Sequence, residues 1–217
     1  MIALLRYQAA SLLRSHRWIF PLITYALLLS VGGVGSGRRA LTDGLAWSAA
    51  LLVPVVALIT RSMLTGEPAA ARACVAAARG PARAQLATLI AAFAAGAVLG
   101  LGGAIYELVT AGHKTAVLTP LAAGLGQALV CALVGAAVGT LFNRPLIRNP
   151  AAALLSTVAA VVVALVSGIS PANAALRGDG AAIQSAAWPR GVPLLAAFAL
   201  AVTSWTVSCW LAGRRAD

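Results

Sequence analysis

The sequence predicts an all-α membrane protein that crosses the bilayer about six times. The chain is 61% hydrophobic and 10% charged, with a mean hydropathy of +0.92, whereas a soluble domain has about 45–50% apolar and about 25% charged residues. Its apolar residues are grouped in six runs without Asp, Glu, Lys or Arg, separated by short polar joins. Most of the 217 residues therefore belong to one transmembrane domain.

The six runs have the length that a membrane requires. A helix rises about 1.5 Å per residue, so roughly 20 apolar residues cross a hydrocarbon core of about 30 Å. The predicted spans are about 18–36, 45–64, 85–106, 120–142, 150–170 and 191–212. The first two apolar runs are short and also fit a re-entrant hairpin. We favour full spans, because neutral residues at 35–37 and 62–64 can lengthen them.

The basic residues predict an orientation with both termini in the cytoplasm, since cytoplasmic segments retain Lys and Arg. In this N-in/C-in topology the cytoplasmic segments hold eleven arginines: Arg6, Arg14, Arg17, Arg61, Arg72, Arg79, Arg83, Arg144, Arg148, Arg214 and Arg215. The outer segments hold five basic residues: Arg38, Arg39, Lys114, Arg177 and Arg190. Basic residues at the ends of apolar runs orient a membrane protein and do not form a face for nucleic acid.

Residues 1–17 have the pattern of a basic amphipathic helix. Arg6, Arg14 and Arg17 fall within one arc, and Leu5 and Leu12 lie on an adjacent apolar stripe. Such a helix lies along the cytoplasmic membrane interface. The same residues also fit an ordinary positively charged flank that only orients the first span, and the pattern does not separate the two interpretations.

The cytoplasmic segment 65–83 contains a second predicted helix. Glu67-Pro68 precedes an alanine-rich stretch and Gly80-Pro81 follows it, which is typical of a helix start and a helix end. The helical spacing predicts a packing face that consists of Ala71, Cys74, Val75 and Ala78, with Arg72 and Arg79 on another face. Docking on a partner protein and resting on lipid headgroups both fit this pattern.

The outer segment 171–190 contains glycine, proline, asparagine and aspartate at turn positions. It also contains a moderately apolar stretch at 181–188. The segment therefore fits either short helices that dip back toward the bilayer or a plain loop.

The sequence gives no indication of catalysis. The apolar runs hold no ionisable group that could drive ion-coupled transport, and His16 and His113 fall on opposite sides in this topology, so no shared metal site is expected. No G-x-x-x-x-G-K-[ST] phosphate loop is present. We therefore expect no enzyme and no cofactor in this chain, and energy for transport would come from another chain.

Several polar and small residues lie within the predicted spans. Three polar side chains either contact a substrate or bond between helices, and they are Gln127, Thr203 and Ser204. Two glycine pairs have the small-xxx-small spacing that allows close helix packing, and they are Gly96 with Gly100 and Gly135 with Gly139. In so glycine-rich a chain, this spacing is also expected by coincidence.

The whole chain resembles the type-2 permeases of ATP-binding-cassette (ABC) exporters. The resemblance lies in the basic N-terminal helix, the six spans and the interrupted segment before the last span. It also lies in local motifs, which are Glu67-Pro68, Arg79-Gly80-Pro81-Ala82-Arg83, and Asn143-Arg144-Pro145 through Asn149-Pro150. It implies that 65–83 carries a coupling helix that seats on a separate ATPase, with contacts from Glu67, Pro68, Arg72, Arg79 and Arg83.

The resemblance further implies an assembly of two permease subunits, identical or paralogous, with two ATPase subunits that bind ATP and Mg²⁺. The expected function is export of a small amphiphile, such as a drug, peptide or lipid-like molecule. The expected location is a bacterial cytoplasmic membrane, and the excess of arginine over lysine fits a G+C-rich genome. The alternative is a non-transporting membrane scaffold or immunity protein that acts by binding a partner through its loops.

Overall fold

A computed structural model describes residues 2–34, 41–111, 118–142, 149–181 and 191–214. The elements within these ranges are all α-helices, which confirms the all-α prediction for this part of the chain. They are α1 (Ile2–Arg14), α2 (Ile19–Val34), α3 (Leu41–Gly66), α4 (Ala69–Arg79), α5 (Pro81–Ala111), α6 (Leu118–Leu141), α7 (Pro150–Val166), α8 (Pro171–Ala181) and α9 (Val192–Arg214).

Five apolar helical stretches in the described ranges are long enough to cross a membrane. They are Leu41–Gly66, Pro81–Thr110, Leu118–Leu141, Ala151–Arg177, which includes the break between α7 and α8, and Val192–Arg214. The protein is therefore a multi-pass membrane protein. At the first predicted span the apolar helix is shorter, Ile19–Gly32, so the count of six crossings stays a prediction.

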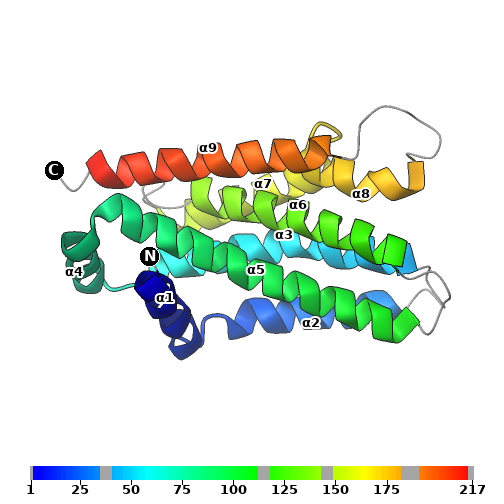
Figure 1. Ribbon diagram of the computed structural model, residues 1–217, viewed down its shortest axis with the longest axis horizontal. Coiled ribbons are helices and arrows are strands. Elements are labelled where there is room, and N and C mark those ends of the chain that lie inside the picture. The colour runs from blue at the N-terminus through cyan, green and yellow to red at the C-terminus, as the bar shows by residue number, and fades with distance from the viewer. Residues whose placement is uncertain (1, 35–40, 112–117, 143–148, 182–190, 215–217) are drawn as a thin grey trace.

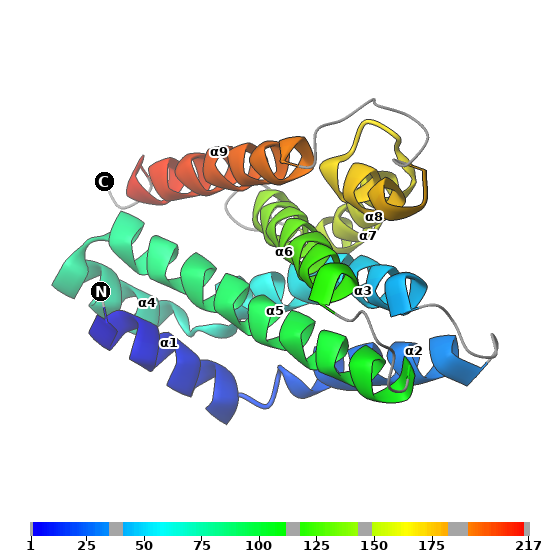
Figure 2. The ribbon, with the colours of Figure 1, turned by 45° about the vertical axis from the view of Figure 1, so that its right-hand side comes forward.

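The long helices lie side by side, and α1 and α4 lie at one end of them (Figure 1). Both α4 and the last turn of α9 lie at the end where α1 is found. Figure 1 views α1 nearly end-on, while α2, α3, α5 and α9 run across the picture, so α1 lies across the bundle axis. The turned view of Figure 2 shows α1 beside the first half of α5. We refer to the end of the molecule that holds α1, α4, the start of α5 and the last turn of α9 as the arginine-rich end.

Helix α3 is the centre of the bundle. It packs against α2, α5, α6, α7 and α8, and its residues Ala49, Val53, Val56 and Ala57 have no exposed surface. The helix continues through Pro54, which membrane helices tolerate when neighbouring helices and local adjustments satisfy the freed backbone groups. The core of the protein is thus built around one helix that reaches the arginine-rich end at Gly66.

Glycines let α6 lie directly on the backbone of α3. A Cβ atom placed on Gly135 would lie 2.7 Å from the carbonyl oxygen of Val53, and one on Gly139 would lie 2.7 Å from that of Ala57. Real Cβ atoms essentially never approach this closely, so neither position has room for a side chain. The glycine spacing in this helix therefore reflects close packing between α3 and α6.

Helices α3 and α5 extend beyond their predicted spans at both ends, whereas α7 ends at Val166, before the predicted end at 170. Helix α5 has 31 residues, which corresponds to about 46 Å at the usual rise per residue, well beyond the roughly 30 Å of a hydrocarbon core. Arg83 therefore lies in the first turns of α5, and Glu107 lies in its last turns. Arg61 likewise belongs to α3 and is half-buried. The outermost turns of these helices carry the ionisable groups that were placed in connecting segments.

Alanine substitution tests the contact between α3 and α6. Gly135→Ala and Gly139→Ala force the two helices apart and are expected to destabilise the protein by about 1–3 kcal/mol, the usual cost of overpacking. The measurement is thermal unfolding of the detergent-solubilised protein. Gly126→Ala is the matched control on the same helix, because a Cβ there meets nothing within 4 Å. Equal melting temperatures for all three variants would contradict the proposed packing.

Candidate functional site at the arginine-rich end

Helix α4 is sharply bounded at both ends. Pro68 precedes it with an extended backbone, φ −57° and ψ 146°. Gly80 ends it with φ +85°, a left-handed value that glycine adopts without strain, and the Gly80 N–H donates to the Ala76 carbonyl at 2.8 Å. Helix α5 then begins at Pro81. The residues that the sequence analysis assigned to the ends of this helix therefore lie at its ends.

The predicted packing face of α4 is only partly correct. Ala71 and Val75 are half-buried, whereas Cys74 and Ala78 are exposed. The helix packs against α5, and its alanines surround the axis almost completely, so the sequence alone does not define a single apolar face. The direction in which Gly80 turns the chain determines which side meets α5.

The opposite side of α4 presents small residues to the surroundings. Ala70, Ala73, Cys74 and Ala77 are all exposed and follow the i, i+3, i+4, i+7 spacing of one helix face. We call these four residues the open face of α4. Arg79 is exposed in the last turn of the same helix. The side chain of Arg72 lies outside the described part of the structure, so its predicted role stays a prediction.

The other predicted cations at this end are accessible. Arg83 is exposed near the start of α5, and Arg6, Arg14 and Arg17 are exposed on and after α1. Exposed guanidinium groups can contact a partner protein or lipid headgroups.

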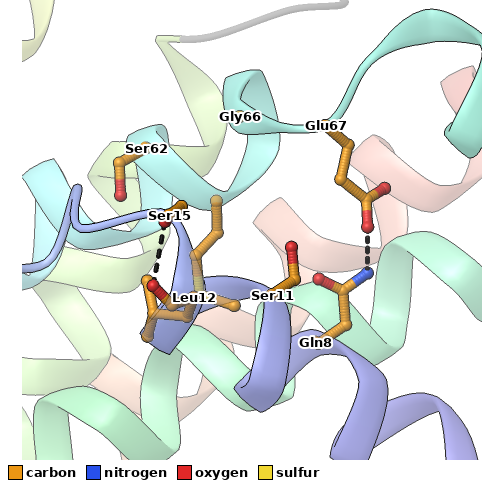
Figure 3. A pocket seen from close by; sticks show the side chains of 8 residues that line it. Gln8, Ser11, Leu12, Ser15, Ser62, Gly66 and Glu67 are labelled. Atoms are coloured by element: carbon orange, nitrogen blue, oxygen red, sulfur yellow. Dashed lines mark hydrogen bonds between the residues drawn. The ribbon is translucent and has the colours of Figure 1, made fainter.

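A partly buried side-chain hydrogen bond joins α1 to the connection between α3 and α4. The Gln8 side-chain amide donates to Glu67 Oε1 at 2.9 Å, and Gln8 is only 2% exposed. Figure 3 shows Gln8 on α1 pointing at Glu67, which lies directly beyond the end of α3. A hydrogen bond to a charged group contributes about 1.5–3 kcal/mol, so this contact is a substantial link between two segments 59 residues apart.

The link lies beside a small polar hollow. Besides Gln8 and Glu67, it is lined by Ser11, Leu12, Ser15, Ser62, Met63 and Gly66. Its empty space is about 280 Å³, and this volume includes open solvent, so the enclosed part is smaller. A pocket for a drug-sized ligand has roughly 300–1,000 Å³. The hollow is a seam between α1 and α3, not a substrate cavity.

The turn from α1 to α2 is fixed by local contacts. His16 has φ +55°, an uncommon value for a residue other than glycine, and its Nδ1 lies 2.9 Å from the Arg14 carbonyl oxygen. The Trp18 indole N–H donates to the Leu13 carbonyl at 3.2 Å. These contacts hold α1 in its crosswise position relative to α2.

The three candidate substrate contacts do not act together in the structure. Gln127 is buried, and its amide donates to the Ala175 carbonyl of α8 at 3.2 Å. Thr203 is exposed and donates to the Ala199 carbonyl of its own helix, and Ser204 is buried and donates to Ala201. Hydrogen bonding between helices is thus observed for Gln127, while the two α9 hydroxyls bond within their own helix.

A polar junction near the other end of the bundle was not anticipated. The Tyr25 hydroxyl of α2, at 4% exposure, donates to the Ser48 carbonyl of α3 at 3.4 Å, and its oxygen lies against Gly103 of α5. One turn further along α5, the Glu107 carboxylate lies over Gly44 of α3. Four residues, or about 6 Å, separate Glu107 from the end of α5. This carboxylate is therefore near the membrane surface and not at its centre.

Among the residues that the structure describes, no three His, Cys, Asp or Glu side chains are grouped so as to hold a metal ion. Comparison of the chain with protein-family models, with curated proteins and with solved structures finds no match.

Gln8 is the site residue that sequence reasoning missed. A signal for it does exist, since Gln8 lies between Leu5 and Leu12 at helical spacing and so interrupts an apolar stripe with an amide. A polar group at such a position needs a partner when buried. The sequence could not show that this partner is Glu67, because that pairing depends on how α1 crosses the bundle.

Removing the Gln8 amide tests the link. Gln8→Leu leaves the half-buried Glu67 carboxylate without this donor, so we expect α1 to detach more often and trypsin to cleave faster after Arg14 and Arg17. Glu67→Gln is the matched control, because its amide oxygen can still accept the bond. Mass spectrometry of the fragments over time gives the rates. Equal rates for Gln8→Leu and the unsubstituted protein would show that the bond does not hold α1.

Proposed function

We propose that this chain is the transmembrane permease subunit of an ABC exporter that moves a small amphiphile out of the cell, powered by a separate ATPase chain. In this proposal the chain crosses a bacterial cytoplasmic membrane six times, with the arginine-rich end in the cytoplasm. Two permease subunits, identical or paralogous, pair with two ATPase subunits that bind ATP and Mg²⁺. The chain itself catalyses no reaction.

The observation that carries the proposal is that α4 follows the central helix α3 almost directly along the chain. Helix α4 is separated from the last residue of α3 only by Glu67 and Pro68. Helix α3 in turn packs against α2, α5, α6, α7 and α8. A force on α4 therefore reaches the helix that contacts nearly every other transmembrane element.

The open face of α4 supports docking on a protein. Its small side chains allow close approach by a neighbouring surface, and exposed Arg79 adds a charge for an acidic partner group. In the proposed mechanism, ATP binding closes the ATPase pair and displaces α4. The displacement passes directly into α3 and, through the bond between Glu67 and Gln8, into α1. The bundle then changes which side of the membrane the substrate path faces.

Two features support a small amphiphile as substrate. Nearly all of the chain belongs to membrane helices and short joins, which leaves little room for an outer receptor domain. The bundle also presents an extensive apolar surface to the bilayer, including Phe198 of α9 and Leu155 of α7. An amphiphile can enter such a protein from the lipid phase.

The proposal predicts an ATPase partner that depends on the open face of α4. We expect the chain to co-purify with an ABC ATPase encoded beside it. Ala73→Trp and Ala77→Trp should block docking sterically, and Ala73→Ser and Ala77→Ser should retain it because serine is nearly as small as alanine. Co-purification and substrate-stimulated ATP hydrolysis in proteoliposomes are the measurements.

The results separate the exporter from the alternative scaffold or immunity protein. Loss of ATPase association in the tryptophan variants but not in the serine variants supports the exporter. Failure of the unsubstituted chain to associate with any ATPase would reject it. Glu67→Leu and Arg72→Ala should lower the coupling between ATP hydrolysis and transport without abolishing membrane insertion.

A further inference from the structure

We propose that the outward side of α1 binds anionic lipid headgroups at the membrane surface, and that this binding sets the position of α4 through the bond between Gln8 and Glu67. The site is a helix surface and its ligand is the anionic leaflet itself. The inference rests on the proposed function only where it treats α4 as the coupling segment. The lipid response of α1 stands on its own contacts.

The outward side of α1 combines cations with interfacial apolar groups. Arg6 and Arg14 are exposed, Tyr7 is 42% exposed and Leu13 is 63% exposed. Helical geometry places these four side chains on one broad face, with Ala10 between them. Helices that lie in the membrane interface have this composition, with basic groups near the phosphates and apolar or aromatic groups in the acyl boundary.

The charge of α1 selects an anionic surface. The helix contains two arginines and no acidic residue, and Arg17 follows it in the chain. Helix α1 lies across the bundle axis (Figures 1 and 2), so in a protein whose long helices cross the bilayer it runs along the membrane plane. Its cations are spread along the helix and are not focused on one point. This arrangement fits many headgroups of a leaflet better than a single bound phosphate.

The inward side of the same helix carries the link to α4. Gln8 is 2% exposed and bonds to Glu67, and Leu12 packs against the core of the protein. Tyr7 and Gln8 are adjacent in sequence, so the lipid-facing and protein-facing groups belong to a single turn of helix. When headgroups draw α1 toward the membrane surface, the Gln8 amide moves with it. Because Gln8 is hydrogen-bonded to Glu67, this movement changes the position of Glu67 just before α4.

Fluorescence at two cysteines tests the proposal in the full chain. Cys74 is exposed on α4, whereas Cys131 is buried and Cys209 is half-buried. Cys131 and Cys209 are therefore replaced by alanine before labelling, and Cys74 is kept. An environment-sensitive thiol dye on Cys74 reports on α4. In a second protein, with Cys74 also replaced, the same dye on Ala10→Cys reports on α1. Each labelled chain is placed in nanodiscs of phosphatidylcholine to which phosphatidylglycerol is added in steps.

We expect phosphatidylglycerol to shift both signals. Arg6→Gln and Arg14→Gln should each weaken the lipid response roughly fivefold, from about 1 kcal/mol per arginine near an anionic surface. Arg6→Lys and Arg14→Lys are the matched controls, because they retain the charge and so retain the response. Gln8→Leu should keep the signal at position 10 and lose the signal at Cys74, which separates lipid binding from its transmission.

Several results would overturn the inference. Equal signals with and without phosphatidylglycerol would reject the lipid site, and an equal response to free glycerol phosphate would replace it with a soluble-anion site. A Cys74 signal that persists in Gln8→Leu would reject the transmission. The assay contains no ATPase, so failure here leaves the exporter proposal standing, and failure to find an ATPase partner leaves a lipid response at position 10 intact.

Discussion

The close contact between the backbones of α3 and α6 is the constraint on which the rest of the structure depends. In a bilayer, lipid is as apolar as leucine, so helices associate through close packing and hydrogen bonds and gain little from excluding water. Gly135 and Gly139 remove the side chains that would separate these two helices. Once α3 and α6 are in contact, α5 and α9 pack around them, and Gly96 and Gly100 bring α5 against Val56 and Leu52 of α3.

Polar side chains then secure the outer helices on this pair. Gln85 of α5 donates to Ser208 of α9 at 3.0 Å. The chain direction changes between α7 and α8, and there the Asn173 amide donates to the Leu165 carbonyl, while Gln127 of α6 donates to Ala175 of α8. Backbone groups freed by a break need such partners within a membrane, where water is not available. These amides therefore allow an interrupted helix where a continuous one would be the default.

The position of α3 supports the coupling role that we propose for the arginine-rich end. A coupling segment at the end of a peripheral helix would move that helix alone. Here the segment continues from the central helix and is also joined to α1 by a partly buried hydrogen bond. One short connection thus joins α4 to the core of the bundle, and a side-chain hydrogen bond joins that connection to α1. In the proposed mechanism, a displacement of α4 therefore acts directly on both.

The sequence by itself determined the all-helical class, the multi-pass membrane character and the approximate places of most long helices, because apolar run length and the rise of a helix are local properties. It also indicated the bounds of α4, since Pro68 and Gly80 act on the backbone next to them. The tertiary structure decided which side of α4 is open, that Gln8 pairs with Glu67, and that Gln127 supports α8. These features depend on how helices distant in sequence cross one another. The sequence of an alanine-rich helix such as α4 does not indicate which side packs, because it has no distinct apolar face.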